Sequence, residues 1–166
     1  PDELTFFMAC EDVDALRPGI PSDIADAARR KYVTRLAVVR LHQAGFRKRV
    51  LTAYRNQCSI CHLKHTELLD AAHIISDKAE HGEPVVPNGL SLCKIHHAAF
   101  DTNILGVTPD YKIEIREDVL EEVDGPMLRY GLQATHGTKL ILPNREAEKP
   151  DRKRLEKRYE EFLAAS

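Results

Sequence analysis

The sequence lacks the features that mark membrane, secreted and disulfide-stabilised proteins. Only four of its 166 residues are cysteine, which is too few for a disulfide scaffold. No apolar run approaches the roughly 20 residues that a membrane-spanning helix needs. The first ten residues have neither the basic start nor the apolar length of a signal peptide. We therefore expect a cytoplasmic protein without a membrane partner.

A strong net charge is also missing. The 24 basic and 26 acidic side chains leave a charge of −2, which excludes a uniformly basic coat for nucleic acid but allows a local basic patch. Hydrophobic residues at 43% and charged residues at 30% exclude wholesale disorder, and the length suits one domain or one domain plus an arm. The chain starts at Pro1, so we expect a fragment of a longer or processed protein.

Charge is distributed unevenly along the chain. Residues 29–55 contain nine Lys or Arg and no acid, whereas residues 110–124 contain seven acids and two bases. The basic stretch is typical of a polyanion-binding surface or of a solvated helix face, and the charges alone do not separate the two. The acidic stretch predicts an exposed edge that repels nucleic acid.

Periodicity predicts two helices before residue 56. Ser22 is a suitable N-cap for a helix that begins at about residue 23 and that Gly45 is expected to interrupt. Four apolar residues then repeat at helical spacing: Phe46, Val50, Leu51 and Tyr54. The other face of this second helix carries the candidate contacts to DNA phosphates: Arg47, Lys48, Arg49 and Arg55.

The middle of the chain predicts short elements. Apolar residues indicate a largely buried strand around His73, and the Gly, Pro and charges of residues 76–88 indicate a loop. A short helix is expected over about residues 94–101.

The last third predicts a small extension that packs on the core. Alternation favours a strand at residues 111–116, and a second short strand is expected at residues 139–142, closed by Pro143. Pro150 and Asp151 begin a final helix with an apolar face formed by Leu155, Tyr159, Phe162 and Leu163. Short strands mixed with helices predict an α+β fold.

The strongest local signal is a pair of metal-binding knuckles. Cys58-x-x-Cys61 is followed downstream by Cys93-x-x-His96, and two such turns complete a tetrahedron around zinc. A closed site of this kind is structural and contributes to folding. His62, His65 and His97 are rival fourth ligands, Cys10 stands alone, and unrelated buried cysteines are the alternative interpretation.

Three further residues form a pattern only when they are taken together, in their order along the chain. His73, Asn88 and His97 are each weak signals alone. The runs Leu-Asp-Ala-Ala-His-Ile and Pro-Asn-Gly-Leu-Ser-Leu-Cys-Lys-Ile-His-His-Ala-Ala-Phe-Asp contain all three, together with the second knuckle. With the zinc ligands, they resemble the HNH endonuclease family over about residues 46–108, and the preceding helix resembles that of bacterial restriction-type members.

The resemblance implies a fold and a role for each residue. The fold would be a zinc-braced ββα-metal core with N-terminal helices and a C-terminal strand and helix extension. His73 would be the general base, and Asn88 would hold the loop and orient His73 by hydrogen bonding. His97 would bind the catalytic divalent metal, Mg²⁺ or Mn²⁺, and Asp101 lies four residues later on the same helix face.

The sequence departs from the family pattern at one position. Many members have a metal ligand immediately before the general base, where this chain has Ala72. Strand alternation places Asp70 on the same face as Ala72, so Asp70 is one candidate replacement. The other alternative is a metal held by His97, Asp101 and water.

These residues predict a metal-dependent nuclease that cuts double-stranded DNA, as the cleavage module of a modification-dependent restriction enzyme. We expect an arm at residues 1–45, a nuclease core at 46–108 and an extension at 109–166, with an upstream reader domain in the full-length chain and a possible homodimer. A non-catalytic zinc-braced module that binds DNA or protein is the alternative from a different class. A nuclease toxin or homing enzyme would share the site.

Overall fold

The computed structural model describes residues 31, 33, 34 and 42–165. The chain divides into two units, Pro1–Leu41 and His42–Ser166. In the first unit the three described residues, Lys31, Val33 and Thr34, are helical and exposed. Residues 1–30, 32 and 35–41 of the predicted arm, which include Cys10 and the start of the basic stretch, lie outside the described residues. No helix in the described part is long and apolar enough to cross a membrane.

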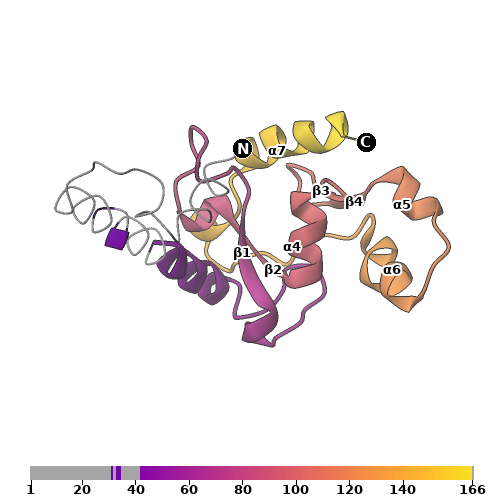
Figure 1. The fold of residues 1–166 in the computed structure, drawn as a ribbon, viewed down its shortest axis with the longest axis horizontal. Helices are drawn as coiled ribbons and strands as arrows, with labels where there is room; N and C mark the ends of the chain where they lie inside the picture. Colours follow the sequence, from indigo (N-terminus) through magenta and orange to yellow (C-terminus); the bar gives the residue numbers. More distant parts are fainter. Residues whose placement is uncertain (1–30, 32, 35–41, 166) are drawn as a thin grey trace, which may run out of the picture. The chain divides into compact units, whose positions relative to one another are not determined.

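The second unit is α+β, and a ββα arrangement stands at its centre (Figure 1). Strand β1 (Leu69–His73) pairs antiparallel with β2 (Gly89–Cys93), and helix α4 (Lys94–Asp101) follows β2 directly. The register places His73 opposite Gly89. The fold class and the bounds expected for this helix are therefore confirmed.

The helix over residues 42–53 covers this motif with the predicted apolar stripe. Phe46, Val50, Leu51 and, just beyond the helix, Tyr54 are all buried. Gly45 lies within the helix, so the predicted interruption there is wrong. A single glycine costs only about 1 kcal/mol relative to alanine in a helix, less than the burial of this stripe contributes.

The helix ends in a Schellman motif without glycine. Asn56 N–H donates to Leu51 O at 2.7 Å, Arg55 N–H donates to Thr52 O at 3.0 Å, and Arg55 is left-handed with φ 58°. This turn directs the chain back toward Cys58, which is fully buried.

The C-terminal part contains a second small sheet and three helices. Strands β3 (Leu105–Val107) and β4 (Ile113–Ile115) pair antiparallel. Helices α5 (Glu117–Glu121), α6 (Pro126–Gly131) and α7 (Arg152–Ala164) follow. The remaining elements are 3-10 turns: η2 (Thr66–Leu68), η3 (Val86–Asn88), η4 (Gln133–Thr135) and η5 (Glu146–Glu148).

Two local predictions in this part are wrong. Residues 139–142 form no strand, because Leu140 N–H bonds to Tyr111 O and Ile141 N–H bonds to Ser59 O, so no continuous ladder develops on one partner. Leu163 was expected on the buried face of the last helix but is 53% exposed. The buried charge Arg158 takes part in that face instead, beside Leu155 and Phe162.

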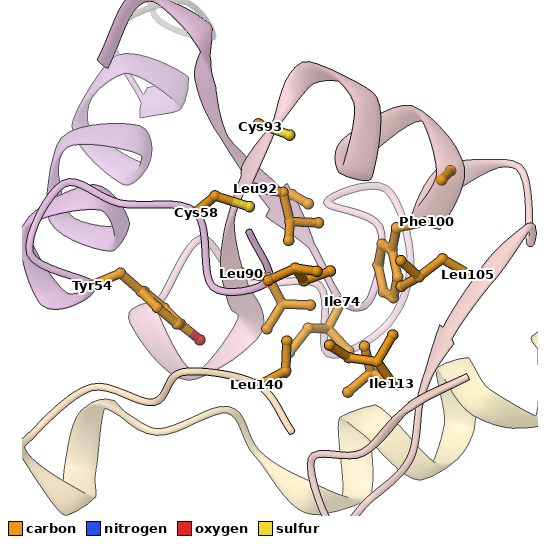
Figure 2. Packing of buried hydrophobic residues seen from close by; sticks show 14 of the residues in the cluster. Tyr54, Cys58, Ile74, Leu90, Leu92, Cys93, Phe100, Leu105, Ile113 and Leu140 are labelled. Carbon is orange, nitrogen blue, oxygen red and sulfur yellow. The ribbon is translucent and has the colours of Figure 1, made fainter. Parts of the chain in front are cut away.

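A single hydrophobic core joins these elements. Figure 2 shows Leu90, Leu92 and Ile74 from the first sheet and its loop close to Phe100, Ile113 and Leu140. Residues from the ββα motif and from the C-terminal part therefore share one interior, and the two parts do not pack independently of each other.

Gly89 allows the helix over residues 42–53 to approach the first sheet closely. A Cβ at this position would lie 2.6 Å from Val50 Cγ2 and 2.8 Å from Phe46 Cζ. Both contacts are too short, so these buried side chains would have to move.

We predict that Gly89→Ala lowers the free energy of unfolding by about 1–3 kcal/mol because it overpacks this contact. Urea denaturation of the variant and the parent measures the change. Gly125→Ala is the control, since a Cβ there meets nothing within 4 Å. Equal stability of parent and Gly89→Ala would contradict the close approach.

Candidate active site and metal centre

The four predicted zinc ligands come together in the structure. One ligand atom each from Cys58, Cys61, Cys93 and His96 lies within 4.8 Å of all the others. His96 Nδ1 is 3.2 Å from Cys93 Sγ and 3.5 Å from Cys58 Sγ, and the sulfurs of Cys61 and Cys93 are 3.9 Å apart. Three sulfurs and one imidazole nitrogen are the donor set of a closed structural zinc site, so this cluster could hold zinc.

The cluster is electrostatically prepared for a cation. Hydrogen bonds from Cys58 and Cys61 hold the pKa of Cys93 far below its usual range, so its thiolate is favoured. Burial lowers the pKa of His96, but hydrogen bonds to the sulfurs of Cys58 and Cys93 outweigh this effect and raise that pKa to about 10. These directions favour a Cys93 thiolate beside a protonated His96, and a bound metal ion would replace the protons of the cluster.

The second nitrogen of His96 is also fixed. Its Nε2 lies 2.7 Å from the carbonyl oxygen of Gly131, the last residue of α6. Donation to this carbonyl leaves Nδ1 free as a metal ligand, a typical outer-shell arrangement around zinc. Nothing in the sequence near Gly131 indicated this contact, because the two residues are 35 positions apart.

The rival fourth ligands lie elsewhere. His62 and His65 are exposed and belong to no group of potential metal ligands among the described residues. His97 is the next residue after His96 on α4, and it faces two carboxylates instead of the sulfurs.

His73 is the last residue of β1 and packs against the helix over residues 42–53. Its ring stacks on Phe46, with centroids 4.1 Å apart and an interplanar angle of 20°. Within the described part of the chain its side chain makes no hydrogen bond, and Nε2 is buried without a partner. Burial lowers the pKa of His73, an effect that Asp77 partly offsets. The imidazole is therefore neutral near pH 7, as a proton acceptor must be.

His97 lies between two carboxylates. Its Nε2 is 3.3 Å from Asp101 Oδ2, and its Nδ1 is 3.5 Å from Asp70 Oδ2. Asp70 also pairs with Lys94 and lies 3.6 Å from Arg47 Nε. Burial alone would raise the pKa of Asp70, but the bond and charge of Lys94 lower it overall, so this carboxylate stays ionised.

His73 and His97 line one pocket of about 380 Å³. Asp77, from the loop after β1, and Asp101, from α4, are also in its wall. Imidazole nitrogen and carboxylate oxygen suit a divalent metal such as Mg²⁺ or Mn²⁺. The residues present therefore fit the metal that an HNH nuclease requires.

A further part of the pocket wall comes from α7. Lys157, Arg158 and Glu161 line it, although they are more than 50 positions beyond α4 in the sequence. The sequence interpretation missed them, because it considered only the apolar side of this helix. No local motif could have indicated them, since only the folded chain brings α7 to the pocket.

Asn88 holds the loop between β1 and β2 but does not contact His73. Its Oδ1 accepts a bond from Ile75 N–H at 2.9 Å, and its Nδ2 donates to Ile75 O at 3.0 Å and to Glu83 O at 3.1 Å. The expected hydrogen bond to the His73 ring is absent from the described structure. The amide instead serves the main chain, and the buried N–H and carbonyl of Ile75 would otherwise have no partner in the described structure.

Most predicted phosphate contacts already hydrogen-bond within the protein. Arg47 donates to the carbonyls of Thr66 and Leu69, Arg49 to that of Pro84, and Arg55 to the side chain of Asn144. Lys48 is exposed, and no ion pair of its ammonium occurs in the described part. Each guanidinium has five N–H donors, so those that are not used within the protein are available for a phosphate. Contacts of these residues with DNA stay a prediction.

We predict that Asn88→Ala lowers the free energy of unfolding by at least about 2 kcal/mol, because it leaves the main-chain groups of Ile75 buried and unpaired. Chemical denaturation measures the change. The control is Asn144→Ala, which removes one exposed hydrogen bond and should change stability by less than about 1 kcal/mol. Similar values for the two variants would contradict the role assigned to the Asn88 amide.

One comparison with known proteins, a family model, agrees with this geometry. The family model described as HNH endonuclease matches residues 58–108, a segment that contains the four-ligand cluster, His73, Asn88, His97 and Asp101. A search of curated proteins found no match. A solved structure named as modification-dependent TagI restriction endonuclease aligns with 20% identity and a TM-score of 0.46, over 69% of this chain.

That alignment covers 36% of the other chain, so the protein spans little more than a third of its length. The assignment rests instead on the family match and on the residues that the fold brings together within it. Residues 58–108 are therefore similar to the HNH endonuclease family.

Proposed function

We propose that this protein is a metal-dependent endonuclease that hydrolyses phosphodiester bonds in double-stranded DNA. One observation carries the proposal: His73, neutral and without a hydrogen-bond partner in the described structure, shares a pocket with the His97–Asp101 pair. A general base and a candidate metal site next to each other are the two parts that phosphodiester hydrolysis needs.

In this proposal His73 removes a proton from the attacking water. Its stacking on Phe46 fixes the plane of the ring, and its lowered pKa keeps the ring neutral. Asn88 contributes indirectly, because it holds the main chain at Ile75, two residues beyond the base.

His97 and Asp101 would hold the divalent metal, which neutralises charge that develops on the phosphate. Asp70 is the third candidate ligand, but it contacts the other nitrogen of His97. A metal shared by Nε2 and Asp101 would leave Nδ1–H directed at Asp70. We therefore assign Asp70 to the orientation of His97, as carboxylates commonly do for metal-bound histidines.

The Cys58, Cys61, Cys93 and His96 cluster would hold a structural zinc. It joins the loop after the helix over residues 42–53 to the start of α4, where His97 directly follows the ligand His96. Structural zinc contributes roughly 10–16 kcal/mol in zinc peptides, whereas a whole domain is stable by only about 5–15 kcal/mol.

We predict one zinc ion per chain and its loss in Cys61→Ser, measured by elemental analysis. Cys61 is exposed, so the substitution removes a ligand without a core cavity. The melting temperature should fall by more than about 10 °C, both in the variant and after chelation of the parent. His65→Ala removes a rival ligand and should retain the metal; zinc retained by Cys61→Ser would refute the assignment.

We predict that His73→Ala reduces DNA cleavage by about 10²- to 10⁴-fold, because the reaction loses its general base. Nicking of supercoiled plasmid in Mg²⁺ or Mn²⁺ at low salt measures the rate, in preparations matched for zinc content. His65→Ala is the control, since this exposed histidine lies outside the pocket. A His73→Ala protein that folds and cuts as fast as the parent would eliminate His73 as the base.

The same assay separates the finer parts of the proposal. Plasmids with and without modified cytosine test the modification-dependent restriction activity, which so far rests on resemblance alone. Failure of a zinc-loaded, DNA-binding parent to cut either plasmid would favour the second candidate function, a zinc-braced binding module. The four-ligand cluster supports this second candidate as well, because a zinc-braced binding module needs the cluster but no catalytic residue.

A further inference from the structure

The wall of the pocket that α7 contributes lies outside the segment that matches the HNH family model. Its position is fixed by packing. Leu155 and Phe162 are buried, and α7 lies against β3 (Figure 1). Gly106 of β3 permits this contact, since a Cβ there would lie 2.6 Å from two ring atoms of Phe162.

Arg158 anchors the same helix to the end of α4. Its guanidinium donates to Phe100 O and to the side chain of Asn103, and it lies 4.7 Å from the centroid of the Phe100 ring. It also pairs with Glu161 at 3.2 Å. Although Arg158 lines the pocket, its charge is therefore already neutralised, and its donors serve the protein.

Lys157 differs from its neighbour Arg158 in its exposure and in its partners. It is exposed and lines the same pocket. No hydrogen bond or ion pair of its ammonium occurs among the residues that the structure describes. Glu161 lies one helical turn away and is the natural partner at this spacing, but it pairs with Arg158 instead.

An unpaired ammonium at a pocket that holds His73, His97 and Asp101 fits an anion between them. A metal on His97 and Asp101 would bind one oxygen of a phosphodiester, and a second oxygen would remain to be neutralised. Lysine supplies a compact, flexible point charge for this purpose. The short side chain of Asp77 in the wall is an anion and cannot do so.

We propose that Lys157 is a substrate-binding residue of the nuclease, and that its ammonium binds a phosphate oxygen of the DNA strand in the pocket. The role rests on the proposed nuclease function. It extends the site beyond the 58–108 segment to α7, and it gives the C-terminal helix a part in DNA binding as well as in the core.

The test compares Lys157→Gln, Lys157→Arg and Lys153→Gln in the full 166-residue chain with zinc bound. Lys153 is exposed on the same helix but does not line the pocket, so it controls for a general loss of positive charge. All variants should melt at the temperature of the parent, because both lysines are exposed and neither ammonium has a hydrogen bond or ion pair in the described structure.

We predict that Lys157→Gln slows single-turnover plasmid nicking by roughly ten- to a hundredfold, the usual effect of losing a hydrogen bond between charged groups. Fluorescence anisotropy with a labelled DNA duplex should show a salt dependence of binding that is lower by about 0.9 in log–log slope, the value for one phosphate contact. Lys157→Arg should restore most of the rate, and Lys153→Gln should resemble the parent.

Two results would overturn the assignment. One is a Lys157→Gln protein that nicks as fast as the parent with an unchanged salt slope. The other is an equal loss in Lys153→Gln, which would make the effect one of overall charge. A parent that does not cut DNA at all would instead remove the nuclease function, so the two failures are distinguishable.

Discussion

The position of the candidate active site depends on the convergence of four ligand atoms from two separate segments. Cys58 and Cys61 follow the helix over residues 42–53. Cys93 is the last residue of β2, and His96 lies in the first turn of α4. Because His97 comes directly after His96, a movement of the junction between β2 and α4 would displace the candidate metal ligand. Gly131 extends the constraint, since its carbonyl fixes the ring of His96 from a segment beyond the family motif.

The two sides of the pocket are held by different forces. On the motif side, His73 is held by β-pairing and by its stacking on Phe46, which reaches it because Gly89 has no side chain. On the other side, α7 is held by apolar burial and by the buried guanidinium of Arg158. A buried charge is stable only when its donors are satisfied, so the bonds to Phe100 and Asn103 are a condition for this packing.

Local sequence patterns predicted the central motif well, because its information is local. The knuckle spacing, the strand around His73 and the helix over residues 94–101 each depend on residues within a few positions of one another. The prediction at Gly45 was wrong because a propensity cost of about 1 kcal/mol is small beside tertiary burial. The prediction of a strand at residues 139–142 was wrong because a short apolar run cannot show whether a partner strand is present.

The contacts that were missed all join distant parts of the chain. The Asn88 amide bonds to Ile75 and not to His73, and only the folded loop shows which polar groups are buried there. The pocket wall on α7 depends on long-range packing in the same way. A motif indicates which residues can carry out the chemistry, whereas the substrate also contacts surfaces that the motif does not contain.

The fold shows where the charges of the chain lie, and this bears on its attraction for DNA. A net charge of −2 suggests little attraction for DNA, yet the acidic stretch that produces it lies mainly on β4 and α5, and none of its residues lines the pocket. Ion pairs satisfy several of the bases, including Arg116 with Asp118 and Arg152 with Asp110. What matters for a polyanion is therefore the position of the unpaired cations and not their total, and Lys157 is such a cation in the pocket that His73 also lines.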